Sequence, residues 1–282
     1  MKNTSVDKTD AKFLLSHLCQ TLLQWPKSYL YSHDLDPLPD AFIKAWQEME
    51  SKRINGTPVA YLVGHREFHN IDLHVAPGVL IPRPETEILV DLVIQEIERL
   101  LTLKNHEKRI RVLDLGTGSG AIALAIAKHF EDLSPELQPR IIALDQSIEA
   151  LEIAKKNSAL LKLNHLVQFI ESDWFSNITN DSKFDIIVSN PPYIAFGDPH
   201  LIQGDLRFEP SNALTDGADG LQAYRIITHQ APSFLSSNGL LLLEHGYEQG
   251  AAIRNLFSDN GFYDMITIRD LANLERHTVG RR

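Results

Sequence analysis

Four consecutive residues, Asn190, Pro191, Pro192 and Tyr193, have side-chain types that together suit one kind of chemistry. They follow the apolar run 184–189, which is typical of a buried strand. Neither proline has a backbone N–H group, and Pro191 also favours an extended backbone at Asn190. The loop therefore offers acceptors, namely the Asn190 side-chain oxygen and the Pro191 carbonyl oxygen. Two converging acceptors suit a planar –NH2 group, and the Tyr193 ring can stack on the flat system that carries it.

An acceptor pair of this kind would help a poor nucleophile to react. The lone pair of an amide or amino-heterocycle nitrogen is delocalised, so this nitrogen attacks slowly by itself. Acceptors that hold both of its hydrogens fix its direction and stabilise the positive charge that develops on it. A proline-rich turn without chemistry is the competing interpretation. We predict catalytic residues at Asn190, Pro191 and Tyr193, and a substrate-binding loop that also includes Pro192.

A second motif, "VLDLGTGSGAIALA", lies at a predicted turn from strand to helix. Its glycines let a ligand approach the backbone, and the start of the helix supplies free N–H groups. The spacing is G-x-G-x-G, and Asp114 stands two residues before the first glycine. Both features disfavour the pyrophosphate of a nicotinamide cofactor and suit S-adenosyl-L-methionine. The loop residues predicted to bind it are Gly116, Thr117, Gly118, Ser119 and Gly120.

The next two predicted strands also end in polar residues. Asp145 ends the run "RIIALD" and is placed to accept hydrogen bonds from ribose hydroxyls. Asp173 and Trp174 follow the third strand, where they can bind adenine by hydrogen bond and by ring contact. An aspartate at a strand end can instead cap the next helix. Several polar residues at strand ends beside one glycine loop favour a site that binds S-adenosyl-L-methionine and releases S-adenosyl-L-homocysteine.

The elements that must position these residues alternate between strand and helix from residue 109 onward. Apolar runs at 109–116, 140–145, 165–173, 183–190 and 238–246 are separated by helical patterns, which predicts a parallel sheet covered on both faces. A short turn joins the last two predicted strands, 262–270 and 275–282, so these two must be antiparallel. We predict an α/β fold with a Rossmann-like sheet that is parallel except for a terminal antiparallel hairpin.

The first part of the chain has a different pattern. Helical periodicity at 11–25, 39–54 and 58–64 predicts a small N-terminal helical domain over residues 1–65. Residues 66–84 alternate and hold three prolines, which predicts a hairpin-like connector, and residues 85–282 carry the two motifs. Arg83 and Glu85, at the end of the connector and the start of a helix, either shape the ligand pocket or only order the connector.

Composition limits the class of protein. The chain has 282 residues, and 27 Lys and Arg against 37 Asp and Glu give a net charge of −10. A protein that binds through phosphate contacts would display clustered basic residues, so no direct nucleic-acid binding is expected. A single cysteine, a polar N-terminus and the lack of an apolar run of about 20 residues predict a cytoplasmic protein without a membrane span. No metal is expected, and we expect a monomer.

Over nearly its whole length the chain resembles the bacterial release-factor glutamine methyltransferases, which are class I S-adenosylmethionine-dependent methyltransferases. The resemblance lies in the stretches "YLVGHREF", "LIPRPETE", "LDLGTGSGAIALA", "SDWF", "VSNPPYI", "HLIQGDLRFEP", "LLLEHG" and "ERHTVGR". It implies methylation of the N5 side-chain nitrogen of the glutamine in the Gly-Gly-Gln tip of class I peptide-chain release factors. It also implies donor binding by Gly116 to Gly120, Asp145, Trp174 and Asn190, and a glutamine held by Asn190 through Tyr193. The helical domain would then dock the release factor.

One predicted loop is expected to contact the substrate. Residues 195–220 read as a long loop with Arg207, Glu209 and Asp216, and we expect it to cover the tip of the substrate.

Three other functions would also fit parts of the sequence. A nucleic-acid amino methyltransferase, acting on adenine N6, cytosine N4 or guanine N2, would use a similar Asn/Asp-Pro-Pro motif. A protein that binds S-adenosyl-L-methionine without turnover is the second alternative, and a nicotinamide dehydrogenase is the third.

Overall fold

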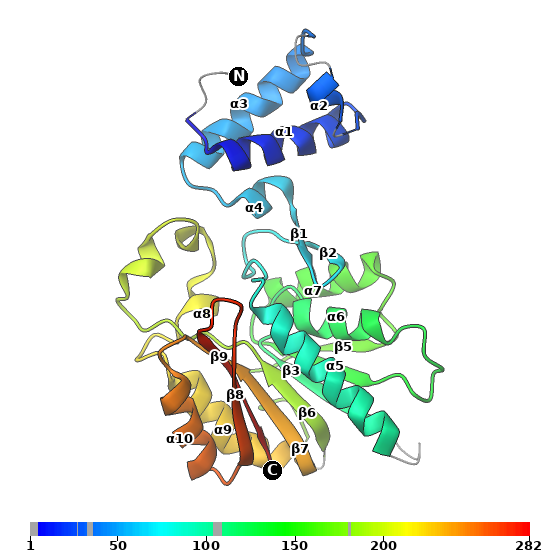
Figure 1. Cartoon of the computed structure of the whole chain (residues 1–282), viewed down its shortest axis with the longest axis vertical. Coiled ribbons are helices and arrows are strands. Elements are labelled where there is room, and N and C mark those ends of the chain that lie inside the picture. The colour runs from blue at the N-terminus through cyan, green and yellow to red at the C-terminus, as the bar shows by residue number, and fades with distance from the viewer. Residues whose placement is uncertain (1–4, 27, 33–35, 104–108, 180–181) are drawn as a thin grey trace.

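In the computed structural model, a small helical part stands above a larger α/β part, and a hairpin lies between them (Figure 1). The structure describes residues 5–26, 28–32, 36–103, 109–179 and 182–282. The first four residues of the polar N-terminal stretch lie outside this range. Within the described residues no helix is long and apolar enough to cross a membrane.

The helical part contains α1 (Lys8–Leu22), α2 (Tyr29–Ser32), α3 (Asp40–Ile54) and α4 (Val59–Val63). The carboxylate of Asp7 accepts a hydrogen bond from the backbone N–H of Thr9 and so caps α1. Helices α1 and α3 bury an apolar cluster that is separate from the core of the α/β part; its largest members are Leu14, Leu18, Phe42 and Trp46. The short α2 was not predicted, because one helical turn gives no periodic pattern.

The connector contains an antiparallel hairpin of β1 (His65–Phe68) and β2 (Ile71–His74). Its two turn residues, His69 and Asn70, have φ angles of 43° and 62°. Two left-handed residues are what a tight hairpin turn requires. The hairpin packs Phe68, Ile71 and Leu73 into the core of the α/β part, which explains the alternating pattern of this stretch.

Seven strands of the described chain form one sheet in the order β5-β4-β3-β6-β7-β9-β8. They are β3 (Arg111–Leu115), β4 (Arg140–Asp145), β5 (Val167–Glu171), β6 (Phe184–Ser189), β7 (Leu235–Glu244), β8 (Tyr263–Arg269) and β9 (Glu275–Arg281). Strands β3 to β7 are parallel, whereas β9 pairs antiparallel with both β7 and β8. The predicted parallel sheet with a terminal antiparallel hairpin is confirmed.

Helices cover both faces of this sheet. Helices α5 (Thr86–Leu103) and α6 (Ala121–His129) pack on one face, and α9 (Gln222–Phe234) and α10 (Gly250–Asp259) pack on the other. Helix α7 (Ile148–Leu160) follows β4 and lies beside β5. Successive residues of β3 alternate between the two cores, Val112 in the first and Leu113 in the second. Burial on both faces accounts for the continuous apolar runs of the parallel strands.

Two expectations about local structure differ from the fold. Residues 195–220 are not an irregular loop, because they contain the 3₁₀ helices η1 (Pro199–Ile202) and η2 (Leu206–Phe208) and the short helix α8 (Ser211–Leu214). Strand β7 begins at Leu235, before the predicted start at residue 238, because it follows α9 directly. In both cases the local sequence lacks a full period from which the element could be recognised.

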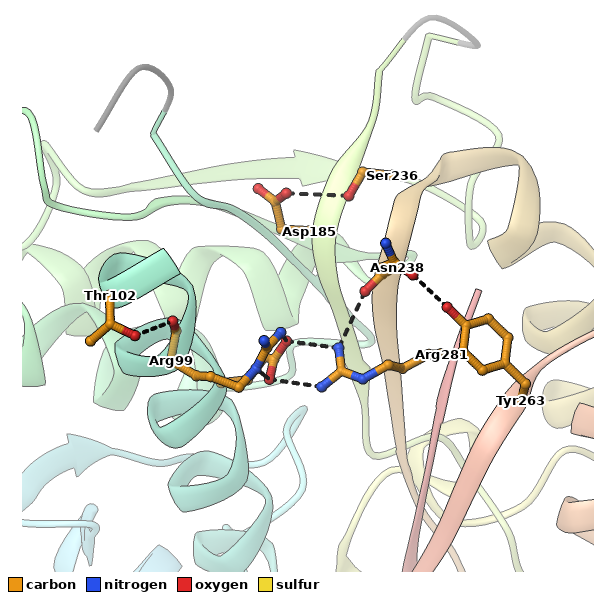
Figure 2. Close-up of polar contacts among 8 residues, drawn as sticks. Arg99, Thr102, Asp185, Ser236, Asn238, Tyr263 and Arg281 are labelled. Carbon is orange, nitrogen blue, oxygen red and sulfur yellow. Dashed lines mark hydrogen bonds and ion pairs between the residues drawn. The ribbon is translucent and has the colours of Figure 1, made fainter. Parts of the chain in front are cut away.

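A buried ion-pair cluster fastens the C-terminal strand to α5 at the amino edge of the parallel strands. Glu96, only 6% exposed, accepts hydrogen bonds from Arg99 and from both terminal nitrogens of Arg281, the latter at 2.9 and 3.0 Å. Figure 2 shows Arg281 reaching from β9 toward α5, with Asn238 of β7 beside it. The hydroxyl of Tyr263 on β8 donates to Asn238 Oδ1. These contacts lie at the edge of the sheet opposite to the carboxyl ends of β3 and β6.

Candidate active site

A cavity lies at the carboxyl ends of β3, β4, β5 and β6, where the order of the strands reverses around β3. Open α/β sheets bind ligands at this position. Nine of the residues predicted from the sequence line the cavity: Gly116, Thr117, Gly118, Ser119, Asp145, Asp173, Trp174, Asn190 and Pro192. Gly120, Pro191 and Tyr193 were also predicted for the site, but they are not part of its wall.

The glycine loop presents bare backbone to the cavity. Gly116 and Gly118 have φ angles of 68° and 56°, and a Cβ atom added at either would meet nothing within 4 Å. A ligand can therefore approach the backbone closely at both positions. Gly120 has a different role, since its added Cβ would lie 2.9 Å from a methyl group of Leu124. Its φ angle of 84° also favours glycine at the start of α6, and its contact with the donor remains a prediction.

Asp145 supports the loop from the end of β4. Its Oδ2 accepts a hydrogen bond from Gly118 N at 2.8 Å, and its Oδ1 accepts one from Ser147 N at 2.9 Å. Burial raises the pKa of the Asp145 carboxyl, against the opposing effect of these N–H groups. Each carboxylate oxygen keeps a second lone pair, so the side chain can hold the loop and still accept a hydrogen bond from a ligand hydroxyl.

Asp114 does not face the cavity, although its position two residues before the glycine loop suggested a carboxylate near the ligand. The side chain is fully buried and does not line the cavity. Its Oδ2 accepts a hydrogen bond from the Thr117 hydroxyl at 2.6 Å, and burial raises the pKa of the carboxyl from 3.8 to about 7. Asp114 therefore holds Thr117 at the start of the glycine loop from below, where β3 is covered on both faces.

Asn190 lies at the end of β6, beside β3. The preceding residue, Ser189, donates its hydroxyl hydrogen to Leu115 O at 2.7 Å and so fixes the ends of the two strands together. Asn190 Nδ2 donates to the hydroxyl oxygen of Thr86 at 3.1 Å. Pro191 is buried, whereas Pro192 lines the cavity. Asn190 Oδ1 accepts no hydrogen bond from the described residues and remains available as an acceptor on the cavity wall.

Tyr193 is fixed from behind. Its carbonyl oxygen accepts a hydrogen bond from Gln249 Nε2 at 3.0 Å, and its ring packs against the apolar cluster beneath α9 and α10. Burial raises the pKa of the Tyr193 hydroxyl to about 12, so this group stays protonated at neutral pH. The stacking of Tyr193 on a substrate remains a prediction.

Part of the cavity wall was not predicted from the sequence. The connector supplies Gly78, Val79, Leu80 and Pro82, helix α5 supplies Thr86, and the region of α8 supplies Pro210, Asn212 and Ala213. The concentration of Gly and Pro in residues 77–84 was the available signal, because such stretches favour close approach of backbone to a ligand.

Arg83 has both of the roles considered for it. It lines the cavity, and its Nη2 donates to Glu209 Oε1 at 2.5 Å. Glu209 is buried, and its second oxygen accepts a hydrogen bond from Ile81 N at 2.9 Å. This pair ties the connector to the segment 195–220. Glu85 does not line the cavity.

The segment 195–220 also contacts the helical part. Arg53 on α3 forms ion pairs with Asp10 at 2.7 Å and with Asp205 at 2.8 Å, and Arg207 donates to Asn55 O. Asp216 orders the end of the segment by accepting hydrogen bonds from three backbone N–H groups. The segment thus connects α3 with the cavity wall, and its contact with a substrate remains a prediction.

No metal centre is evident in the part of the chain that the structure describes, where no three His, Cys, Asp or Glu side chains are grouped suitably. His245, at the end of β7, is buried, with Nδ1 close to Gly246 O and Nε2 at 2.9 Å from the Thr278 hydroxyl. Burial lowers the pKa of His245. His245 is therefore a buried contact at the strand end.

The fold and this site define a methyltransferase with a Rossmann-like sheet. A family model described as a methyltransferase domain matches residues 106–277, and one described as the PrmC N-terminal domain matches residues 2–64. A protein of Xylella fastidiosa (strain 9a5c) called release factor glutamine methyltransferase is 45% identical over 276 residues, which is 98% of this chain and 94% of that protein. The protein of the same name from Burkholderia pseudomallei is 41% identical, over 100% of this chain and 94% of that one. The chain belongs to the release factor glutamine methyltransferase family.

A solved structure agrees with this fold. The 16S rRNA N2 G1207 methyltransferase (RsmC) of T. thermophilus, in complex with AdoMet and guanosine, has a TM-score of 0.51 and 19% identity. The alignment covers 77% of this chain and 49% of that one. At this identity the likeness supports the α/β fold alone.

Proposed function

We propose that this chain transfers a methyl group from S-adenosyl-L-methionine to the N5 nitrogen of the glutamine in the Gly-Gly-Gln motif of class I peptide-chain release factors. The observation that carries the proposal is the position of Asn190 on the wall of the glycine-loop cavity, at the end of β6 beside β3. An acceptor for a substrate –NH2 group is thereby next to the place where a methyl donor would bind. The name of the relatives supports the choice of a release factor as substrate.

The residues of the cavity suit the methyl donor. The open space over Gly116 and Gly118 leaves room for its amino-acid end against the backbone and the start of α6. Asp145, Asp173 and Trp174 line the cavity, which supports hydrogen bonds from the ribose hydroxyls to Asp145 and contacts of Asp173 and Trp174 with adenine. The bound donor supplies a methyl group on a sulfonium sulfur and leaves as S-adenosyl-L-homocysteine.

The chain contributes orientation and electrostatics to the reaction. Asn190 Oδ1 and the Pro191 carbonyl oxygen hold the two hydrogens of the glutamine –NH2 group, while Pro192 and Tyr193 border its carboxamide plane. As the N–C bond forms, the S–C bond breaks and both electrons of that bond stay on sulfur. The nitrogen then loses one proton to solvent, so no base is required. Asn190 thus stabilises the charge that develops on nitrogen during transfer.

The test is methyl transfer from labelled donor to an intact class I release factor and to a Gly-Gly-Gln peptide, with mass spectrometry to locate the methyl group. We expect one methyl on the glutamine side chain, and a loss of at least about 100-fold in kcat for Asn190→Ala. Asn255→Ala, an exposed amide on α10, is the matched control and should leave kcat unchanged. Labelled nucleic acid with an unlabelled release factor would contradict the proposal.

We further propose that residues 1–65 dock the release factor. A groove between α1 and the β1–β2 hairpin has Phe13, His17, Val63 and Ile71 among its lining residues, and Phe13 is 48% exposed there. Phe13→Asp should raise KM for the intact factor about tenfold, because a buried aromatic contact would be lost, but leave KM for the short peptide unchanged. Ile43→Asp is the control, since Ile43 is similarly exposed at 41% but lies outside the groove. An equal rise for factor and peptide would contradict docking by this groove.

A further inference from the structure

We propose that Thr86 is a positioning residue that keeps the side-chain amide of Asn190 in its productive orientation. The inference rests on the proposed function. A side-chain amide has an acceptor end and a donor end, and only one of its two orientations turns Oδ1 toward a substrate –NH2 group. In the other orientation, the Nδ2 hydrogens of Asn190 would face the hydrogens of the substrate –NH2 group.

The contact between the two residues is well defined. Thr86 is the first residue of α5 and is 4% exposed, so its hydroxyl cannot turn to solvent. Its Oγ1 accepts a hydrogen bond from Asn190 Nδ2 at 3.1 Å, and both residues line the cavity. Among the described residues, Thr86 is the partner to which the Asn190 side chain donates.

This partner completes the productive orientation. When Oδ1 receives a hydrogen from the substrate, Nδ2 has to donate elsewhere, because an unpaired N–H group in a half-buried site is unfavourable. The Thr86 oxygen is the acceptor that satisfies it. The hydroxyl hydrogen of Thr86 rotates freely about the C–O bond and does not obstruct this acceptance. The substrate –NH2 group requires Oδ1 to face it, and removing the Thr86 hydroxyl leaves Nδ2 without an acceptor in that orientation, so the productive orientation loses stability.

Thr86→Val keeps the shape of the side chain and removes the hydroxyl, while Thr86→Ser keeps the hydroxyl. With donor and Gly-Gly-Gln peptide at saturation, we expect kcat of Thr86→Val to fall about tenfold and kcat of Thr86→Ser to stay within about threefold of wild type. Calorimetry should give a donor Kd that is similar for all three proteins. A kcat of Thr86→Val within threefold of wild type would overturn the inference, as would Thr86→Ser being as slow as Thr86→Val. Absence of methylation by the wild-type chain would instead overturn the proposed function and remove the basis of the inference.

A double-mutant cycle separates orientation from a structural effect. Asn190→Asp presents a carboxylate, which has an acceptor in either orientation and needs no partner to set it. In that background Thr86→Val should reduce kcat less than threefold. A reduction of about tenfold in both backgrounds would mean that Thr86 acts through packing and would overturn the inference. If Val at this position prevents folding, Thr86→Ala, which introduces no bulk, is carried through the same cycle.

Discussion

Gln249 joins three segments through one side chain, and it contacts the Asn-Pro-Pro-Tyr loop at the carbonyl oxygen of Tyr193. Gln249 Nε2 donates to Tyr193 O at 3.0 Å and to Gly220 O at 3.1 Å. Gln249 Oε1 accepts a hydrogen bond from Gly246 N at 2.9 Å. The backbone of the Asn-Pro-Pro-Tyr loop is thus held by the turn between β7 and α10, although neither segment is near the other in the sequence.

Gln249→Ala should lower kcat for the Gly-Gly-Gln peptide about tenfold, because the carbonyl of Tyr193 loses the donor that fixes it. The donor Kd should not change, since Gln249 does not line the cavity. Steady-state kinetics and calorimetry measure the two quantities. The adjacent Glu248→Ala is the control, because Glu248 is exposed. An unchanged kcat for Gln249→Ala would show that this contact does not position the loop.

Gly220→Ala should damage the same loop by a different route. A Cβ atom at residue 220 would lie 2.5 Å from Tyr193 O, and the φ angle of 78° is strained for alanine. Gly217→Ala is a matched control, with a φ angle of 73° and nothing within 4 Å of its added Cβ. We expect a loss of unfolding free energy of about 1 kcal/mol for Gly217→Ala and of at least about 3 kcal/mol for Gly220→Ala. Equal losses in urea unfolding would exclude the steric contribution.

Asp173→Ala should weaken donor binding about tenfold, because the proposed hydrogen bond to adenine is lost. The fold should be unaffected, since the exposed carboxylate forms no hydrogen bond with the described residues. Glu171→Ala provides the control, because Glu171 is exposed at the end of β5, carries the same charge and lies outside the cavity. Isothermal titration with S-adenosyl-L-homocysteine measures both variants. Equal Kd values for them would contradict the assignment of Asp173.

Asp114 makes stability depend on pH. The pKa of its carboxyl is raised by burial from 3.8 to about 7, so the folded state binds a proton more tightly than the unfolded chain between these values. Stability of the wild type should therefore fall with rising pH relative to Asp114→Asn, by up to about 1.4 kcal/mol per pH unit between about pH 4 and pH 7. Urea unfolding of both proteins across this range measures the difference. A difference that is constant with pH would mean that the carboxyl titrates normally.

Arg281→Ala should destabilise the fold by about 2 kcal/mol, because it leaves the buried Glu96 paired only with Arg99. It should not change the rate of methyl transfer. The ion pair lies at the amino ends of the parallel strands, and the site lies at their carboxyl ends. Thermal unfolding measures the loss, and kcat of the folded variant should equal that of the wild type. Arg282→Ala, which removes a charge from the next residue and spares Glu96, is the control.

The sequence alone determined the fold class and the shared location of the predicted site. The periods of the apolar residues are local, and the carboxyl ends of parallel strands must meet at one edge, so Asp145, Asp173 and Asn190 could be placed together before the structure was known. The same local reasoning could not tell that Asp114 faces inward. In a strand buried on both faces, the residues facing either core are equally apolar. The apolar pattern therefore does not show which way a given side chain points.

Only the tertiary structure decided which side chains hold the site in place. Thr86 and Asn190 are 104 residues apart, and Gln249 and Tyr193 are 56 apart. No periodicity or motif relates such positions, because their contact depends on how α5 and α10 pack against the two faces of the sheet. The participation of the connector and α8 in the cavity wall has the same origin. Local propensity sets the elements of this protein, and long-range packing sets the hydrogen bonds that orient its site.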